Sequence, residues 1–370
     1  MLKGAAVSYT TRKVYIGGMG TTKRISIGGD SPVSIQTMWK EGITEVLNNR
    51  DALFSVVDRI EKLSALGCDI LRFAVPDMAS ADALVKIAEN TSMPLVADIH
   101  FDYKLALRCL EGNVAKIRIN PGNIGSRDRV EAVVNGCREK GAAIRIGVNT
   151  GSLPKDIAES VRENKISRSE ALAETAAREV AIFDELNFKD VIVSMKASSV
   201  VETVESNQVF ASKYDVPLHV GVTEAGPLIG GIVKSTLAFS QLLNQNIGNT
   251  IRVSLSSSPD NEVITAREIL RETGKRSGGV KIVSCPRCGR NGFDVHGFVN
   301  RWQNELMSMN KDITVAVMGC VVNGPGEGKH ADIGITGAGD KVIIFKHGEI
   351  IQTVSAENAD IVFRKELLSL

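Results

Sequence analysis

The sequence predicts an α/β protein whose larger part is a TIM (β/α)₈ barrel. Apolar β-like runs alternate with amphipathic helical segments, and eight such runs occur before residue 260. Eight is the number of strands that closes this barrel, and its usual size of about 250 residues fits the same stretch. An open, doubly wound parallel sheet is the alternative that the same alternation allows.

The elements of the barrel follow in order along the chain. The predicted strands are Val33–Met38, Asp69–Val75, Leu95–His100, Ala115–Asn120, Ala143–Asn149, Val191–Lys196, Pro217–Glu224 and Thr250–Ser256. The predicted helices are Asp51–Leu66, Ser80–Glu89, Asp102–Glu111, Asp128–Lys140, Ser167–Leu186, Ser235–Asn244 and Asn261–Glu272. In the first helix Leu53, Ile60 and Leu63 recur at helical spacing. The segment Leu153–Glu163 receives no assignment.

A second domain is expected after the barrel. Residues 1–273 form the barrel, residues 274–279 a polar, glycine-rich linker, and residues 280–370 a small α+β domain. Its predicted strands are Ile313–Met318, Ala331–Thr336, Lys341–Lys346 and Glu349–Thr353, and its helices are Phe293–Met309 and Ala356–Leu368.

Composition excludes several classes of protein. The net charge of +1 over 370 residues provides no global field to attract nucleic acid. We find no apolar run long enough to span a bilayer and no secretory signal, so we expect a cytoplasmic protein with no membrane partner. In such a protein the six cysteines are expected to be free thiols or metal ligands.

One face of the predicted barrel strands is unusually polar. Side chains alternate between the two faces of a strand, and the apolar set must face the helices, so the polar set points into the barrel. This set is Gln36, Arg72, Asp98, His100, Lys116, Arg118, Asn120, Arg145, Asn149, Ser194, Lys196, Arg252, Ser254 and Ser256. Asp98 and Glu224 are too few to balance the cations, and an unpaired buried charge is costly. We therefore expect a phosphate or diphosphate ligand; internal salt bridges or positions at the strand bottoms are the alternative.

The C-terminal domain carries a candidate metal site. Cys285 and Cys288 form a C-x-x-C pair, and Cys320 lies in the glycine-rich run from Gly319 to Gly328. Glu327, His330 and His296 are the local candidates for a fourth ligand. This pattern favours an iron–sulfur cluster, with structural zinc and a redox-active disulfide as alternatives. Cys68, Cys109 and Cys137 look like ordinary buried cysteines of the barrel.

Five segments together resemble the bacterial 4-hydroxy-3-methylbut-2-en-1-yl diphosphate synthase family. They are Cys285-Pro-Arg-Cys288, Gly319-Cys-Val-Val-Asn-Gly-Pro-Gly-Glu327, Lys116-Ile-Arg-Ile-Asn-Pro-Gly-Asn123, Arg145-Ile-Gly-Val-Asn149 and His219-Val-Gly-Val-Thr-Glu224. The resemblance implies a TIM barrel joined to a domain similar to those of sulfite and nitrite reductases. It also implies reductive ring opening of a cyclic diphosphate, with electrons from flavodoxin or ferredoxin, and a head-to-tail homodimer in which one subunit's cluster domain caps the other's barrel.

The resemblance also assigns roles to residues. It places a [4Fe–4S] cluster on Cys285, Cys288, Cys320 and Glu327, and a catalytic acid at Glu224. It implies diphosphate contacts at Arg72, Arg118, Asn120, Arg145, Asn149, Lys196, Arg252 and Ser254, with His100 nearby. One departure is visible, because Trp39-Lys-Glu-Gly42 replaces the Thr-Asn-Thr-like loop that is usual in the family.

Two other functions fit parts of the pattern. One is a phosphosugar or pteroate-type barrel enzyme with a structural zinc domain. The other is a non-catalytic iron–sulfur electron carrier or redox sensor, which would not need the cationic barrel face.

Overall fold

The computed structural model describes residues 9–286, 288–289, 292–321, 324 and 326–370. The chain divides into two compact units, Met1–Arg276 and Ser277–Leu370.

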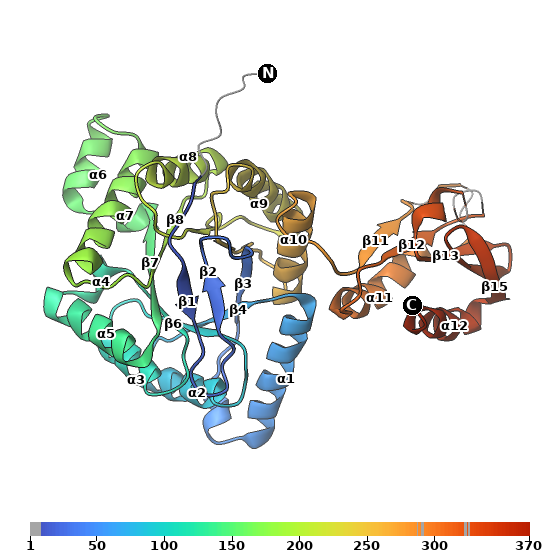
Figure 1. The fold of residues 1–370 in the computed structure, drawn as a ribbon, viewed down its shortest axis with the longest axis horizontal. Helices are drawn as coiled ribbons and strands as arrows, with labels where there is room; N and C mark the ends of the chain where they lie inside the picture. Colours follow the sequence, from blue (N-terminus) through green and yellow to red (C-terminus); the bar gives the residue numbers. More distant parts are fainter. Residues whose placement is uncertain (1–8, 287, 290–291, 322–323, 325) are drawn as a thin grey trace. The chain divides into compact units, whose positions relative to one another are not determined.

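The first unit contains an eight-stranded parallel sheet that is nearly closed, so the predicted TIM barrel is confirmed (Figure 1). Its strands are β3 (Ser34–Met38), β4 (Ile70–Ala74), β5 (Leu95–Asp98), β6 (Lys116–Ile119), β7 (Ala143–Asn149), β8 (Val191–Lys196), β9 (His219–Val220) and β10 (Thr250–Ile251). They are hydrogen-bonded in the order β8-β7-β6-β5-β4-β3-β10-β9. A parallel bridge between Val193 and Leu218 joins the two ends of this series.

Helices follow the strands and form the outer layer. They are α1 (Arg50–Leu66), α2 (Met78–Ala88), α3 (Tyr103–Leu110), α5 (Arg127–Lys140), α7 (Arg168–Glu185), α8 (Val200–Ala211), α9 (Leu228–Leu243) and α10 (Pro259–Glu272). Shorter elements are η1 (Thr44–Leu47), α4 (Pro121–Ile124), η2 (Thr150–Ser152) and α6 (Lys155–Arg162), the last of which lies in the segment left unassigned from sequence. The α1 boundaries show the local causes: the Asn49 side chain accepts from the first-turn N–H groups, and Gly67 ends the helix at φ 110°.

The last two barrel strands are much shorter than the sequence indicates. β9 ends at Val220 and β10 ends at Ile251, so the predicted strand ends at Glu224 and Ser256 are wrong. The backbone of Glu224 has φ 49°, and Gly226 has φ 110°, neither of which a strand can accommodate. The residues after both strands therefore form loops at the carboxyl end of the barrel.

A hairpin that the sequence did not reveal covers the amino-terminal end of the barrel. β1 (Val14–Ile16) pairs antiparallel with β2 (Ile25–Ile27), and both lie across the ring of strands in Figure 1. The buried side chains of Val14, Ile16 and Ile27 pack on residues at or near the starts of five barrel strands, namely Ile70, Val96, Ala115, Ala143 and Ile192. This apolar cluster closes the barrel at that end.

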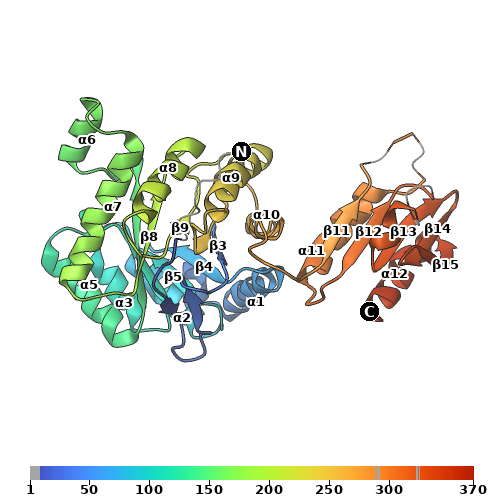
Figure 2. The same cartoon turned by 45° about the horizontal axis from the view of Figure 1, so that its top comes forward.

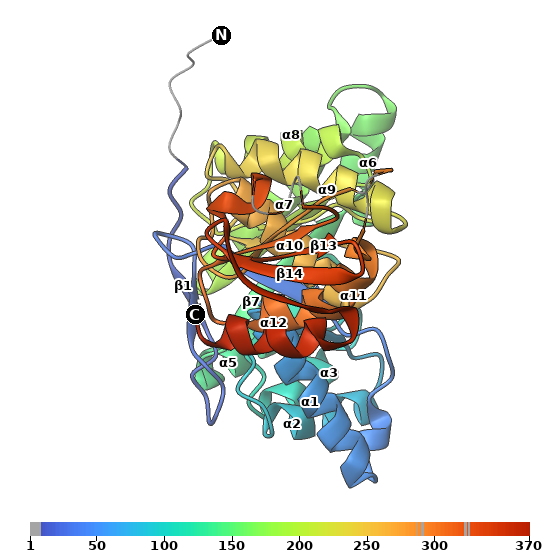
Figure 3. The same cartoon turned by 90° about the vertical axis from the view of Figure 1, so that its right-hand side faces the viewer.

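The second unit is a five-stranded mixed sheet with two helices. The strands β11 (Lys281–Ser284), β12 (Thr314–Met318), β13 (Ile333–Ala338), β14 (Lys341–Lys346) and β15 (Glu349–Ser355) lie in sequence order, as Figure 2 shows. The two helices are α11 (Val295–Ser308) and α12 (Ala359–Leu368), both labelled in Figure 3. They contribute Phe298, Trp302 and Phe363 to one core on the sheet. On the opposite face Phe345 and Met318 pack beside Cys285 and the turn η3 (Glu327–His330).

Within the described residues, no helix is both long and apolar enough to cross a membrane.

Candidate functional site

A polar pocket of about 240 Å³ lies inside the carboxyl end of the barrel, where enzymes of this fold keep their active sites. We call it the lumen pocket. It is lined by Arg72, Arg118, Arg145, Gly147, Val148, Asn149, Ser194, Lys196, Thr223, Glu224, Arg252 and Ser254. The structure thus brings together most of the substrate-binding residues expected from sequence. His100 and Asn120 do not line it.

Asp98 at the end of β5 is one anionic centre of the lumen. Its Oδ1 accepts from Nη1 of Arg118 at 3.1 Å, and its Oδ2 lies 3.6 Å from Nε of Arg72. Burial alone would raise the pKa of Asp98, but the Arg72 and Arg118 guanidinium groups and a hydrogen bond from His100 hold that pKa well below its ordinary value. Asp98 is therefore a fixed negative charge that orients two guanidinium groups toward the pocket.

Glu262 in the first turn of α10 is a second anionic centre, and sequence reasoning missed it. Its Oε2 accepts from the Thr37 hydroxyl at 2.6 Å and lies 3.7 Å from Nε of Arg252. Its Oε1 accepts from the Leu255 N–H at 3.0 Å and lies 2.9 Å from Nζ of Lys40. Glu262 thus ties the loop after β3 to the loop after β10. Glu224, which the sequence offered with Asp98 as an ordinary partner for the lumen cations, lines the pocket but is exposed.

The segment Trp39–Gly42, which departs from the family pattern, takes part in this connection. Trp39 is buried and stacks on Phe73 with 5.5 Å between ring centroids. Lys40 also donates to the backbone oxygen of Leu255 at 2.8 Å. The direct strand contact between β3 and β10 spans only two residue pairs, so Lys40 and Glu262 extend the connection toward the carboxyl end.

Two cations deeper in the barrel lack a carboxylate partner among the described residues. Nζ of Lys116 is fully buried and donates to Oε1 of Gln36 at 3.4 Å. Nε and Nη1 of Arg145 are buried with no hydrogen-bond partner in the described part of the chain. Burial, followed by repulsion from Arg145 and Arg72, lowers the pKa of Lys116 well below its ordinary value. A ligand anion would relieve both repulsion and unsatisfied hydrogen bonding here.

Lys196 at the end of β8 contacts the buried His219, which in turn contacts the buried Thr250, and neither of the two was given a role from sequence. Its Nζ lies 3.1 Å from Nε2 of His219, and Nδ1 of His219 lies 2.6 Å from the Thr250 hydroxyl. His219 and Thr250 are completely buried on neighbouring strands β9 and β10. The signal that could have found His219 is its position, two residues before a glycine on a strand with polar inward-facing residues.

The two predicted asparagines shape turns at the carboxyl ends of their strands. Oδ1 of Asn120 accepts from the Gly122 N–H at 3.1 Å and so caps α4. Oδ1 of Asn149 accepts from the Gly151 N–H at 3.1 Å. Asn149 lines the lumen pocket, whereas Asn120 acts on the backbone of the α4 turn.

Glu179 of α7 is a buried carboxyl beside Gly122 of α4. Its Oε2 has no partner among the described residues. Burial raises the pKa of Glu179 to about 7.

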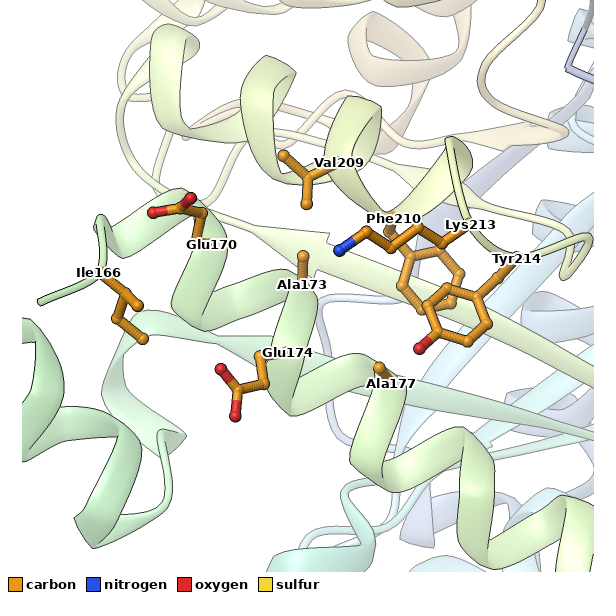
Figure 4. A pocket seen from close by; sticks show the side chains of 9 residues that line it. All are labelled: Ile166, Glu170, Ala173, Glu174, Ala177, Val209, Phe210, Lys213 and Tyr214. Atoms are coloured by element: carbon orange, nitrogen blue, oxygen red, sulfur yellow. The ribbon is translucent and has the colours of Figure 1, made fainter.

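A larger pocket of about 350 Å³ lies outside the barrel between α7 and α8 (Figure 4). Ala173 and Ala177 leave room beside Val209 and Phe210, and Phe210 stacks on Tyr214. Its carboxylates already have partners: the Glu170 side chain bonds the Ser167 N–H, and Glu174 pairs with Arg178 at 2.6 Å. This pocket therefore has apolar walls but no convergent reactive groups.

In the second unit, two of the three predicted cysteine ligands, Cys285 and Cys320, lie just after the carboxyl ends of adjacent strands. Cys285 follows β11 directly and its N–H donates to the Val317 oxygen at 3.0 Å. Cys320 comes two residues after β12, the parallel neighbour of β11. Beyond Cys288 in the sequence, the Gly292 N–H donates to the oxygen of Gly319, the residue before Cys320, at 2.8 Å.

The chemistry and packing of this edge fit an iron–sulfur cluster. Three thiols are soft donors of the kind that bind such clusters. Glycines bring the backbone close: a Cβ atom at Gly337 would lie 2.3 Å from the Gly292 oxygen, and one at Gly324 would lie 2.6 Å from Cγ2 of Thr336. The Thr336 hydroxyl is buried and has no partner in the described part of the chain. A bound polar group, such as a cluster sulfide, would give the Thr336 hydroxyl a hydrogen-bond partner.

The fourth ligand expected from the resemblance is only partly described. Glu327 begins η3, but its side chain lies outside what the structure describes. Among the described residues, no group of three or more His, Cys, Asp or Glu side chains is arranged to hold a metal ion.

Comparison with known proteins matches both units. The family described as the GcpE TIM-barrel domain matches residues 11–267, and the GcpE protein C-terminal domain matches residues 281–368. The protein named 4-hydroxy-3-methylbut-2-en-1-yl diphosphate synthase (flavodoxin) of Treponema denticola is 60% identical, with 92% of this chain and 91% of that protein covered. The protein of the same name from Treponema pallidum is 57% identical, with 100% of this chain and 94% of that protein covered.

Among solved structures, a dihydropteroate synthase from Coxiella burnetii superposes with a TM-score of 0.46 at 11% identity, covering 71% of this chain and 98% of that one. A likeness at this level supports no statement about function.

Proposed function

The chain belongs to the GcpE family, and from that premise we propose that it carries out the reaction for which its relatives are named. It is an oxidoreductase that converts 2-C-methyl-D-erythritol 2,4-cyclodiphosphate into 4-hydroxy-3-methylbut-2-enyl diphosphate. The ring opens, a hydroxyl is lost as water, and two electrons are taken up. The family match does not favour the alternative of a phosphosugar or pteroate-type enzyme with a zinc domain.

The observation that carries the substrate assignment is the surplus of cations around the lumen pocket. Arg72, Arg118, Arg145, Lys196 and Arg252 line it, while the buried carboxylates beside them are Asp98 and Glu262. A cyclic diphosphate supplies the missing negative charge, and forked guanidinium groups match phosphate oxygens. Binding there fixes the carbon skeleton toward the mouth of the barrel.

Glu224 is the side chain that we propose as the proton donor. It lies on the rim of the lumen pocket, on the loop after β9, with a left-handed backbone conformation. A carboxyl at the rim can deliver a proton to a departing hydroxyl of a substrate held deeper in the pocket. Strained backbone is often retained where a side chain must point to a reaction centre.

The second unit would hold the [4Fe–4S] cluster on Cys285, Cys288 and Cys320, with Glu327 as the fourth ligand. When bound, the cluster supplies one-electron transfer to the substrate. Flavodoxin is the proposed electron donor, because the relatives' names specify it. Close packing near Cys320 supports this proposal, because a Cβ atom at Gly324 would lie 2.6 Å from Cγ2 of Thr336.

Turnover of the cyclic diphosphate tests this function directly. Anaerobically prepared protein should contain iron and sulfide and should turn over the substrate only with a reductant such as reduced flavodoxin. Cys320→Ala should abolish turnover and lower the iron content, whereas Cys137→Ala, which changes a buried free thiol of α5, should retain both. A colourless protein loaded with zinc, or unchanged activity in Cys320→Ala, would contradict the proposal.

We also propose that the enzyme is a head-to-tail homodimer in which each barrel works with the cysteine-bearing unit of the other subunit. Cys320→Ala and Arg145→Met each disable a different unit. Co-expressed, the two inactive variants should then form some fully competent sites and regain turnover. Lack of recovery in a verified mixed dimer would exclude this arrangement.

A further inference from the structure

The side chains behind Lys196 are arranged around its ammonium group. Lys196 lines the lumen pocket from the end of β8, and Nζ is 3.1 Å from Nε2 of His219. His219 lies on β9, and Gly221 follows the strand directly and also approaches the Lys196 ammonium group. Neither residue is used in the function proposed above.

The contacts of the His219 ring are consistent with one tautomer. Burial and the neighbouring guanidinium groups lower the pKa of Lys196 well below its ordinary value. In its charged form Lys196 only donates, so Nε2 of His219 then accepts and the ring proton resides on Nδ1. That proton is donated to the Thr250 hydroxyl at 2.6 Å. Burial lowers the pKa of His219 well below its ordinary value, and the charges of Lys196, Arg145, Lys116 and Arg72 lower it further. The ring is a neutral acceptor aimed at Lys196.

Gly221 supplies the space that the ammonium group occupies. A Cβ atom at this position would lie 2.8 Å from Nζ of Lys196 and 3.0 Å from the Arg252 oxygen. The backbone of Gly221 is not in the left-handed region, so its conformation does not require glycine. Glycine at this position therefore makes room for Lys196 and is not required by the local backbone conformation.

We propose that His219 and Gly221 are positioning residues that hold the Lys196 ammonium group in the lumen pocket, where it binds a phosphate oxygen of the substrate. The inference rests on the proposed function for the identity of that ligand. The lysine side chain is flexible and would otherwise occupy several rotamers. The acceptor nitrogen of His219 and the space left by Gly221 together favour a single rotamer of Lys196.

Binding of inorganic pyrophosphate to the full chain, measured by calorimetry, tests the proposal without turnover. Losing one charge-assisted hydrogen bond corresponds to a loss of affinity of about 10-fold or more. Lys196→Met, His219→Leu and Gly221→Ala should each show such a loss, while His219→Gln, which can keep an acceptor near the Nε2 position, should recover much of it. Gly230→Ala is the matched control, because nothing lies within 4 Å of a Cβ there.

A double variant separates positioning from general damage to the fold. In Lys196→Met, the group to be positioned is gone, so adding His219→Leu should cause no further loss of pyrophosphate affinity. Additive losses, or wild-type affinity in both His219→Leu and Gly221→Ala, would overturn the inference. Thermal unfolding of each variant shows whether the barrel itself has been weakened.

A ligand-free experiment distinguishes failure of this inference from failure of the proposed function. The chain has five histidines, so ¹⁵N-histidine spectra are simple enough to assign with a His219→Gln variant. His219 should be neutral with its proton on Nδ1, and Lys196→Met should shift its resonances. A charged ring, or a proton on Nε2, would overturn the positioning role. Absence of pyrophosphate binding in the wild type would instead count against the proposed phosphate site.

Discussion

The lumen pocket and the carboxyl ends of β11 and β12, where Cys285 and Cys320 lie, are organised by different means. In the lumen, buried side chains hold other side chains: Asp98 orients Arg118, Glu262 holds Lys40, and His219 faces Lys196. At these strand ends, backbone hydrogen bonds from Cys285 and Gly292 and close backbone packing at glycines position the chain.

The difference follows from what each region must bind. Long cationic side chains need fixed rotamers before a substrate arrives, because ordering them during binding would reduce affinity. Short thiol side chains have little freedom, so a shaped backbone suffices, and the proposed cluster would contribute further local stability. The lumen should therefore depend on its own charges, and the strand ends that carry Cys285 and Cys320 on the proposed cluster.

Removal of iron should give the largest effect and should separate the two regions. Chelation of anaerobically prepared protein is expected to lower the melting temperature of the second unit by about 10 °C or more, because the proposed cluster would bind and stabilise the folded form of this unit. Differential scanning calorimetry should show the barrel transition almost unchanged. Equal shifts of both transitions would mean that the regions do not differ in this respect.

Asp98→Asn should destabilise the barrel by about 3–5 kcal/mol, because it leaves Arg72 and Arg118 buried without their carboxylate. Inorganic pyrophosphate should restore part of this loss by supplying negative charge. Denaturant unfolding with and without pyrophosphate measures both effects. A variant as stable as the wild type would show that the lumen is not organised by this charge.

Glu262→Gln should cost about 2–3 kcal/mol and raise KM for the cyclic diphosphate more than it lowers kcat. The change removes the charge that faces Lys40 and Arg252 while preserving the shape of the side chain. Glu272→Gln, on the exposed side of the same helix, is the control and should leave KM and stability unchanged. A fall in kcat alone would argue against a role in holding Arg252 for binding.

Glu179→Gln should give the smallest effect. It should raise the free energy of unfolding by about 1–3 kcal/mol at neutral and higher pH and leave it unchanged at acidic pH. The pKa of Glu179 rises from 4.5 to about 7 on folding, because burial disfavours the charged form. The folded protein therefore binds this proton more tightly than the unfolded chain, and wild-type stability falls as pH rises from about 4.5 to 7. The glutamine variant avoids this loss.

The matching measurement is unfolding of wild type and Glu179→Gln between pH 4 and 8. The variant should be more stable at pH 8, and the two should converge near pH 4. Glu185→Gln, at the exposed end of the same helix, should follow the wild type throughout. A stability difference that does not vary with pH would contradict a buried, titrating Glu179.

The barrel and its cationic face could be predicted from sequence because both depend on local alternation. Arg145 and Ile146 take opposite faces of one strand whatever the rest of the fold does. The pairing of Glu262 with Lys40 could not be found in this way. The two residues are more than 200 positions apart, and their contact depends on how α10 packs on the barrel. The inward glycines were also missed: Gly147 makes room for Arg118, as Gly221 does for Lys196, and a lone glycine in a strand carries no sign of its neighbour.

The hairpin β1–β2 escaped prediction because each of its strands has only three residues, too few for a periodic pattern. Its apolar side chains seal the amino-terminal end of the barrel. The lumen pocket is consequently closed at this end of the barrel, so the proposed substrate and product would enter and leave at the carboxyl end. Since both carry a diphosphate, a product molecule that has not yet departed blocks the next arrival, and product inhibition should be competitive with the cyclic diphosphate.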